Sequence, residues 1–86
     1  MHRNPGPYTG KGPRNYKRSD SRIEEDINDR LTEHPMLDAT DIEVSVENGD
    51  VTLRGYVESR QAKRLAEETA DWVPGVMDVH NDLQVR

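Results

Sequence analysis

Histidines and closely spaced carboxylates are the residues of this sequence whose types could support catalysis or bind a metal. The three histidines are His2, His34 and His80, and no pair has the His-x-x-x-His spacing that brings two ligands to one metal. The chain has no Cys, which excludes thiol chemistry, disulfides and cysteine-based zinc sites. The carboxylates around Glu24 fit a solvated helix face and lack the apolar pocket that acid–base catalysis by carboxylates requires. We therefore expect no enzyme activity, no metal site and no cofactor.

Charge divides the chain into two segments. Of its 86 residues 12 are Lys or Arg and 17 are Asp or Glu, which gives a net charge of -5. Five of the basic residues and none of the acidic ones lie in residues 1–18, so residues 19–86 carry a net charge of -10. An acidic domain repels phosphates, and the sequence has no Gly-x-x-Gly loop of the kind that KH domains use. We therefore expect no nucleic-acid binding by residues 19–86.

Residues 1–18 have the composition of a disordered tail or linker. Three of the five prolines and three of the six glycines lie there, and no aliphatic residue follows Met1. Such a segment buries too little apolar surface to offset an ordering entropy of about 1–2 kcal/mol per residue. One interpretation is a solubilising leader or an interdomain linker. The other is a basic arm for anionic lipid or nucleic acid, in which Tyr8 and Tyr16 could stack on bases.

The first predicted element after this segment is an amphipathic helix. An apolar residue recurs at every fourth position and gives one stripe: Ile23, Ile27 and Leu31. Ser21 and Glu24 match a capping box, and Ser19 and Asp20 are alternative caps. The helix should end before Pro35, because the residue that precedes a proline disfavours helical backbone angles.

Two alternating runs on either side of Asn48-Gly49 predict a β-hairpin with a two-residue turn. Residues 42–47 and 51–57 alternate apolar and polar side chains. One face collects the apolar ones: Ile42, Val44, Val46, Val51, Leu53 and Val57. Gly55 lies on the same face, where it should let a helix backbone approach closely or allow a bend.

A second helix and a third strand complete the pattern. Ser59 can cap the helix, and Pro74-Gly75 ends it. Its apolar stripe contains five residues: Ala62, Leu65, Ala66, Thr69 and Val73. The strand follows at residues 79–85, and a right-handed crossover makes it parallel to the strand before the helix. We expect an α+β domain over residues 19–86, with the order αββαβ, a three-stranded mixed sheet and two amphipathic helices on one sheet face.

The glycine and apolar spacing over residues 19–86 resembles a BON domain. Four motifs carry the likeness: Asp20 with Ile23, Ile27 and Leu31, the run IEVSVENGDVTLRGYV at 42–57, the alanines at 62, 66 and 70, and GVMDVHNDLQV at 75–85. The family takes its name from bacterial osmotically inducible periplasmic and nodulation-related proteins. The resemblance implies a non-enzymatic module that binds phospholipid membranes in bacterial stress responses, while other members help bind small ligands or ions. The chain departs from many members because it has one copy of the domain and no secretory signal, which favours the cytoplasm.

Two surfaces are candidates for binding. The first combines apolar and basic residues of the second helix and the turn after it: Trp72, Met77, Lys63 and Arg64. This group could insert shallowly into a membrane or contact a partner, or Trp72 could cover the edge of the core. The second is a basic–aromatic group on the bare sheet face: Arg54, Tyr56, His80 and Arg86. It could be a docking surface or an ordinary solvated face. The glycines at 49, 55 and 75 are expected to shape turns.

The function we expect is that of a monomeric, non-catalytic binding module that associates with phospholipid membrane surfaces in a bacterial osmotic or envelope stress response. The alternative is a protein–protein interaction or oligomerisation module of a larger cytoplasmic protein. A third hypothesis is that the acidic face senses a small ligand or an ion. We expect the protein in the cytoplasm, with peripheral contact to a membrane.

Overall fold

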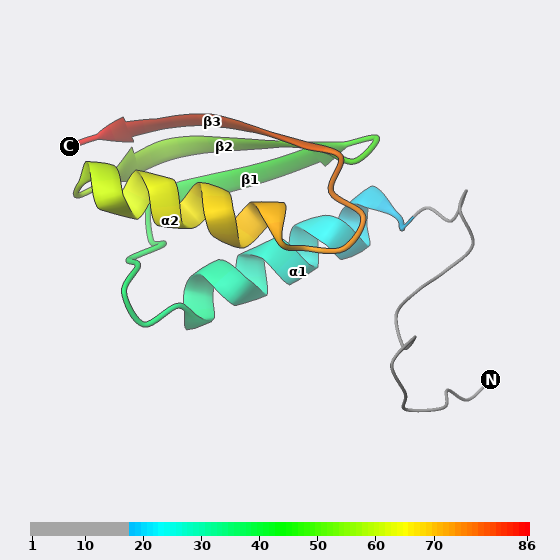
Figure 1. Ribbon diagram of the computed structural model, residues 1–86, viewed down its shortest axis with the longest axis horizontal. Coiled ribbons are helices and arrows are strands. Elements are labelled where there is room, and N and C mark those ends of the chain that lie inside the picture. The colour runs from blue at the N-terminus through cyan, green and yellow to red at the C-terminus, as the bar shows by residue number, and fades with distance from the viewer. Residues whose placement is uncertain (1–17) are drawn as a thin grey trace.

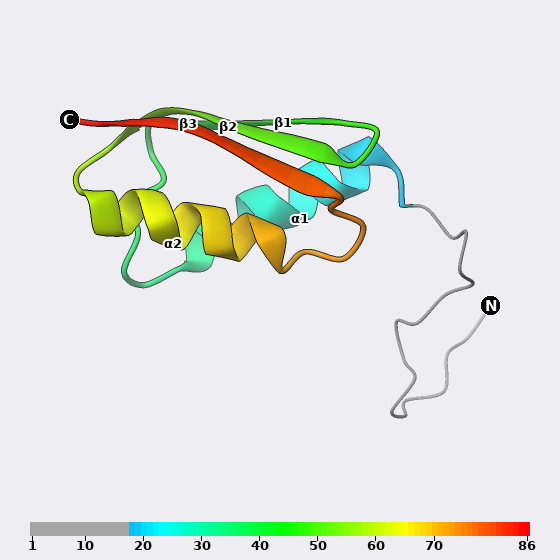
Figure 2. The same cartoon turned by 45° about the horizontal axis from the view of Figure 1, so that its top comes forward.

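The computed structural model describes residues 18–86, which form the predicted sequence of elements. They are α1 (Asp20–Glu33), β1 (Ile42–Glu47), β2 (Asp50–Val57), α2 (Arg60–Asp71) and β3 (Asp78–Val85). The strand order is β1-β2-β3, with β1 antiparallel to β2 and β2 parallel to β3. Both helices cover one face of the sheet (Figures 1 and 2). The predicted α+β fold is confirmed. The tail predicted for residues 1–18 lies outside the described residues, except for Arg18.

Helix α1 is capped at Ser19, one of the two alternative caps, and not by the capping box predicted from Ser21. Ser19 is the N-cap, and its hydroxyl accepts a hydrogen bond from the backbone N–H of Arg22 at 3.3 Å. The helix therefore begins at Asp20, whose carboxylate accepts hydrogen bonds from the backbone N–H groups of Asn48 (2.8 Å) and Gly49 (3.1 Å). The earlier start follows from this contact, because it attaches the first turn of α1 to the hairpin. Helix α2 starts as predicted, with the Ser59 hydroxyl accepting from the Ala62 N–H at 3.0 Å.

The hairpin has the predicted two-residue turn. Glu47 pairs with Asp50 across it, and Asn48 and Gly49 have φ angles of 52° and 84°. Both residues adopt the left-handed region that this turn requires. Gly55, with φ 117°, lies against the carbonyl of Asp41, so the backbone that approaches it belongs to the loop before β1 and not to a helix.

The core lies between the helices and the sheet. Its fully buried large side chains come from α1, β2 and β3: Ile23, Ile27, Leu31, Val51, Leu53 and Leu83. Helix α2 buries Ala66 and Ala70, while Leu65 and Thr69 of the predicted stripe are only half-buried. Ala70 was missing from that stripe. These two small side chains bring α2 close to the sheet, because they fill little of the space between the layers.

Candidate functional site

The segment from Trp72 to Met77, here called the 72–77 loop, joins α2 to β3 and presents two large apolar side chains to solvent. Trp72 is 79% exposed and Met77 is 77% exposed. Val73, the residue after Trp72, is 2% exposed and belongs to the core. The edge of the core is therefore closed by Val73, and the Trp72 indole is left outside it.

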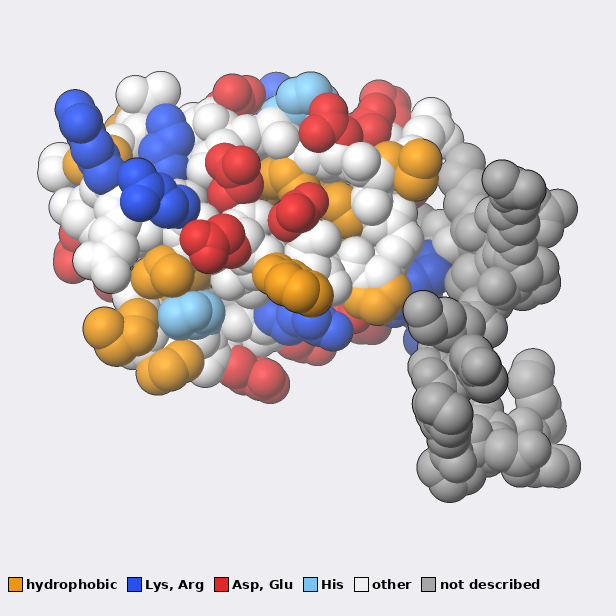
Figure 3. Space-filling model, viewed as in Figure 1, with side chains coloured by type: hydrophobic (Ala, Val, Ile, Leu, Met, Phe, Trp, Pro, Cys, Tyr) orange, Lys and Arg blue, Asp and Glu red, His pale blue; other side chains and the backbone are white. Residues whose placement is uncertain are grey.

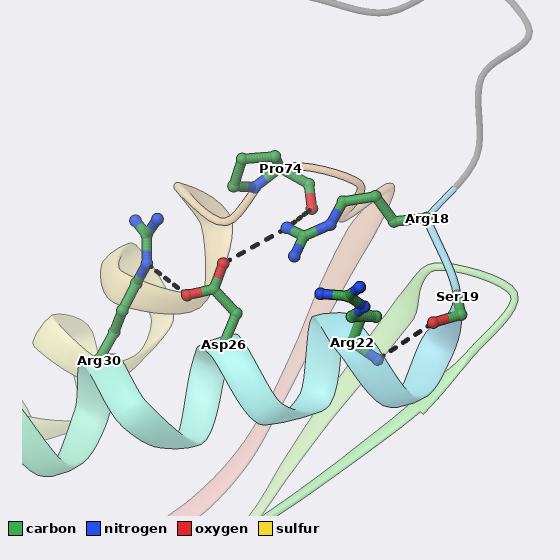
Figure 4. A network of polar contacts seen from close by, with 6 residues as sticks. All are labelled: Arg18, Ser19, Arg22, Asp26, Arg30 and Pro74. Atoms are coloured by element: carbon green, nitrogen blue, oxygen red, sulfur yellow. Dashed lines mark hydrogen bonds and ion pairs between the residues drawn. The ribbon is translucent and has the colours of Figure 1, made fainter. Parts of the chain in front are cut away.

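Three contacts hold the 72–77 loop in place. The guanidinium of Arg18 donates a hydrogen bond to the Pro74 carbonyl at 2.9 Å (Figure 4). The backbone N–H of Met77 donates to the Gly49 carbonyl at 2.8 Å, which joins the loop to the hairpin turn. A Cβ at Gly75 would lie only 3.0 Å from the Ile23 side chain and 3.2 Å from that of Arg18. The loop is thus attached both to α1 and to the sheet.

The basic residues beside this loop come from α1 and from the residue just before its N-cap. Arg18, Arg22 and Arg30, here called the basic stripe, are spaced by multiples of four residues, and so is Asp26 between them. Arg22, Asp26 and Arg30 lie along one side of α1 because of this spacing, and Arg18, which precedes the helix, contacts Asp26 on that side. Figure 4 shows the three guanidinium groups on the side that faces Pro74. Figure 3 shows hydrophobic side chains beside Lys and Arg side chains over the end of α2 and the adjoining part of α1. This side of the domain combines exposed apolar and cationic groups.

The cations predicted to accompany Trp72 occupy a different place. Lys63 and Arg64 lie nine and eight residues before Trp72, about 12–14 Å along the axis of α2. Nine residues are about two and a half turns, so Lys63 also lies on the opposite side of the helix. Glu68 is one turn from Trp72, and its backbone carbonyl accepts the Trp72 N–H. The structure therefore does not bring Lys63 and Trp72 together.

Asp26 organises the basic stripe. Its two carboxylate oxygens contact the Arg30 Nε at 2.9 Å and the Arg18 Nη1 at 3.3 Å. Partial burial acts to raise the pKa of Asp26, but the hydrogen bonds and charges of Arg30 and Arg18 outweigh it and hold the pKa below its ordinary value. Among the described residues, no hydrogen-bond acceptor or carboxylate contacts the Arg22 guanidinium. Arg22 is therefore the member of the stripe most available to an anion.

Sequence reasoning missed this stripe because Arg18 was assigned to the tail. The four-residue spacing of Arg18, Arg22, Asp26 and Arg30 was the available signal, since it parallels the apolar stripe one residue further along. What the sequence does not contain is the position of the 72–77 loop, which is 56 residues from Arg18 and lies against it in the fold.

The predicted basic–aromatic group on the bare sheet face is divided by the strand register. Arg86 lies over the Tyr56 ring, 5.0 Å from its centroid, and pairs with Asp41 at 3.1 Å. Arg54 lies between two acids, with register partners Glu43 in β1 and Asp82 in β3. His80 lies near the start of β3, at the hairpin end of the sheet, with its Nε2 3.6 Å from the Asp78 carboxylate. Of these four residues only Tyr56 and Arg86 meet, at the end of the sheet remote from the hairpin turn.

Within residues 18–86 no group of three His, Asp or Glu side chains is arranged to hold a metal ion. In this part of the chain, no helix is both long and apolar enough to cross a bilayer. Of the three glycines expected in turns, Gly49 and Gly75 lie in turns, whereas Gly55 lies within β2 and pairs with both neighbouring strands. All three have positive φ angles.

The fold and these features define a small α+β domain whose candidate contact groups lie on its outer surface. The BON domain family model matches residues 19–86, and the chain belongs to this family. Osmotically-inducible protein Y of Escherichia coli (strain K12) is 37% identical over 67 residues, which are 78% of this chain and 33% of that protein. The chain thus spans about a third of the length of this curated relative.

A solved structure has the same fold. It is the C-terminal domain of CdsD, the structural protein of the type III secretion system of Chlamydia trachomatis, with a TM-score of 0.64. The sequences are 20% identical, and the match covers 78% of this chain and 33% of that chain. At this identity the likeness establishes a shared architecture.

Proposed function

We propose that this BON domain is a non-catalytic module that associates reversibly with phospholipid membrane surfaces. The observation that carries the proposal is the exposed Trp72 on a loop attached to the basic stripe through Arg18. An indole is suited to the membrane interface, where its ring meets both apolar chains and water. The stripe supplies cations for lipid phosphates at the same side of the domain.

Magnitudes indicate a weak contact. Each Arg near an anionic surface contributes about 1 kcal/mol, and complete burial of one large apolar side chain contributes about 1.5–3 kcal/mol. The net charge of -10 over residues 19–86 opposes approach to the same surface. At 0.15 M salt the Debye length is about 8 Å, so the local stripe counts for more than distant acids. We therefore expect binding that is reversible and that weakens at high salt.

The name of the Escherichia coli relative supports a role in osmotic stress. We extend that context to this chain as part of the proposal, with the domain on a membrane surface that faces the cytoplasm. Sedimentation with anionic and with neutral phospholipid vesicles across a salt series tests it. Binding to anionic vesicles that declines with salt supports the proposal, and absence of binding to both kinds refutes it.

An interaction with another protein is the second candidate function. Trp72 and Met77 are both exposed on a loop held by several contacts, and large exposed side chains of this kind, Trp above all, also suit the centre of a protein interface. If vesicles fail to bind, retention of a defined protein partner that is lost on Trp72→Ala would favour this function.

A further inference from the structure

The bare face of the sheet carries an excess of acid at its hairpin end. Glu47, Asp50 and Asp78 are register partners across the three strands, so their side chains form one row. Two further carboxylates, Glu43 and Asp82, lie on the same face in the third row from the turn, one on each side of Arg54. All five residues are exposed. The row of Glu47, Asp50 and Asp78, here called the acidic row, lies at the end of the face that is remote from Arg86 and Tyr56.

The chain enters the described domain at the same end. Asp20 holds both backbone N–H groups of the turn that joins Glu47 to Asp50. Arg18 contacts Gly75, and the Met77 N–H contacts the carbonyl of Gly49 in that turn. Arg18, the residue to which the segment 1–17 is bonded, therefore lies beside the hairpin end of the sheet.

The segment attached there has the opposite charge. Residues 1–17 contain four basic residues and no acidic one, and three of them are spaced three apart: Lys11, Arg14 and Lys17. Seven residues span at most about 25 Å when extended, and an eight-residue strand is about 26 Å long. The basic residues can thus reach the carboxylates of the acidic row without displacing any part of the fold.

We propose that residues 1–17 of this chain dock through their basic side chains on the acidic row of the bare sheet face. A tethered segment acts at an effective concentration in the millimolar range, so individually weak ion pairs suffice to populate the contact. The segment then neutralises part of the excess acid of the domain and covers the sheet face that the helices leave bare. This inference concerns the face opposite the helices and is independent of the proposed membrane contact.

Paramagnetic relaxation in the full chain tests the docking. The sequence has no Cys, so Thr9→Cys gives a single site for a nitroxide label. We expect amide signals of Glu47, Asp50 and Asp78 to be broadened several-fold more than those of the outer residues of α1. At about 1 M salt the Debye length is about 3 Å, and the difference between the two faces should then disappear.

Charge reversals provide the matched comparison. Glu47→Lys with Asp50→Lys should remove the broadening of the sheet face, whereas Glu25→Lys with Asp29→Lys, the same change on exposed residues of α1, should leave it. Equal broadening of both faces, or stronger broadening on α1, overturns the proposal. So does broadening that appears only when labelled and isotope-enriched molecules are mixed, because the occupant is then a second copy. The salt series decides the question even if the charge-reversed variant fails to fold.

Discussion

The guanidinium of Arg18 donates to the carbonyl of Pro74, 56 residues further along the chain, at 2.9 Å. The same guanidinium contacts Asp26 at 3.3 Å, so it joins α1 to the 72–77 loop. Because of this relationship, the exposed Trp72 and the basic stripe occupy fixed positions on one side of the domain. The first prediction tests whether that arrangement, and not basic charge in general, supports membrane contact.

Replacement of Arg22 should weaken vesicle binding more than replacement of Arg64. Arg22 lies in the basic stripe with a free guanidinium among the described contacts, whereas Arg64 lies about 12 Å along α2 from Trp72. Loss of about 1 kcal/mol per cation corresponds to about fivefold weaker binding. Sedimentation of Arg22→Gln and Arg64→Gln with anionic vesicles measures both, and equal losses would show that position does not matter.

Arg18→Ala should loosen the 72–77 loop. The substitution removes a charged hydrogen bond to Pro74 and one ion pair with Asp26, and such contacts contribute about 1–2 kcal/mol at partly exposed sites. Hydrogen exchange at Val76 and Met77 should accelerate, while exchange in β2 should change only as global stability changes. Arg60→Ala, at an exposed position in the first turn of α2, serves as the control. Unchanged exchange in the loop would mean that the Gly49 contact alone holds it.

Acid should remove the contribution of Asp26 to stability. Its folded pKa is below the ordinary value despite partial burial, because Arg30 and Arg18 favour the charged form. The free-energy contribution is therefore present above about pH 4 and is lost as the pH falls through the folded pKa. At pH 6 the free energy of unfolding of the wild type should exceed that of Asp26→Asn by about 0.5–1 kcal/mol. In urea unfolding the free energies of the two proteins should converge towards pH 2, and a difference that stays constant down to pH 2 would contradict the role given to the Asp26 carboxylate.

Gly55→Ala should destabilise the domain strongly. The backbone φ angle at this position is 117°, and a Cβ here would overlap the carbonyl of Asp41. That carbonyl accepts a hydrogen bond from the Tyr56 N–H at 3.1 Å. The strained backbone alone costs about 1–3 kcal/mol, and the overlap adds to it. Thermal unfolding measures the loss, with Ser45→Ala on the exposed side of β1 as the control. A shift no larger than that of the control would contradict the strained φ assigned to Gly55.

The sequence was sufficient for the architecture because local signals agreed with one another. The spacing of Ile23, Ile27 and Leu31, the Asn48-Gly49 turn and the alternating strands each depend on neighbours along the chain. They predict the elements and the face that each one buries. The predicted right-handed crossover then made β3 parallel to β2, as observed.

The candidate site was only partly accessible from the sequence, because it depends on contacts between distant segments. Trp72 and Met77 could be singled out by residue type, and Trp72 is exposed because Val73 is buried in its place. The position of Arg18 beside Pro74 has no local signal. Lys63 was grouped with Trp72 by proximity in sequence, but nine residues of helix turn it to the opposite side. On the bare sheet face, Arg54 was grouped with Tyr56 and Arg86, but the strand register places it between Glu43 and Asp82.

Fluorescence of Trp72 tests the central claim most directly, because it is the only Trp in the chain. On titration with anionic phospholipid vesicles, its emission should shift to shorter wavelength and an aqueous quencher should become less effective, as the indole leaves water. Both changes should diminish with salt and with Arg22→Gln. A chain that sediments with the vesicles while Trp72 keeps its emission and its quenching, or one that does not bind at all, would contradict membrane contact through the 72–77 loop.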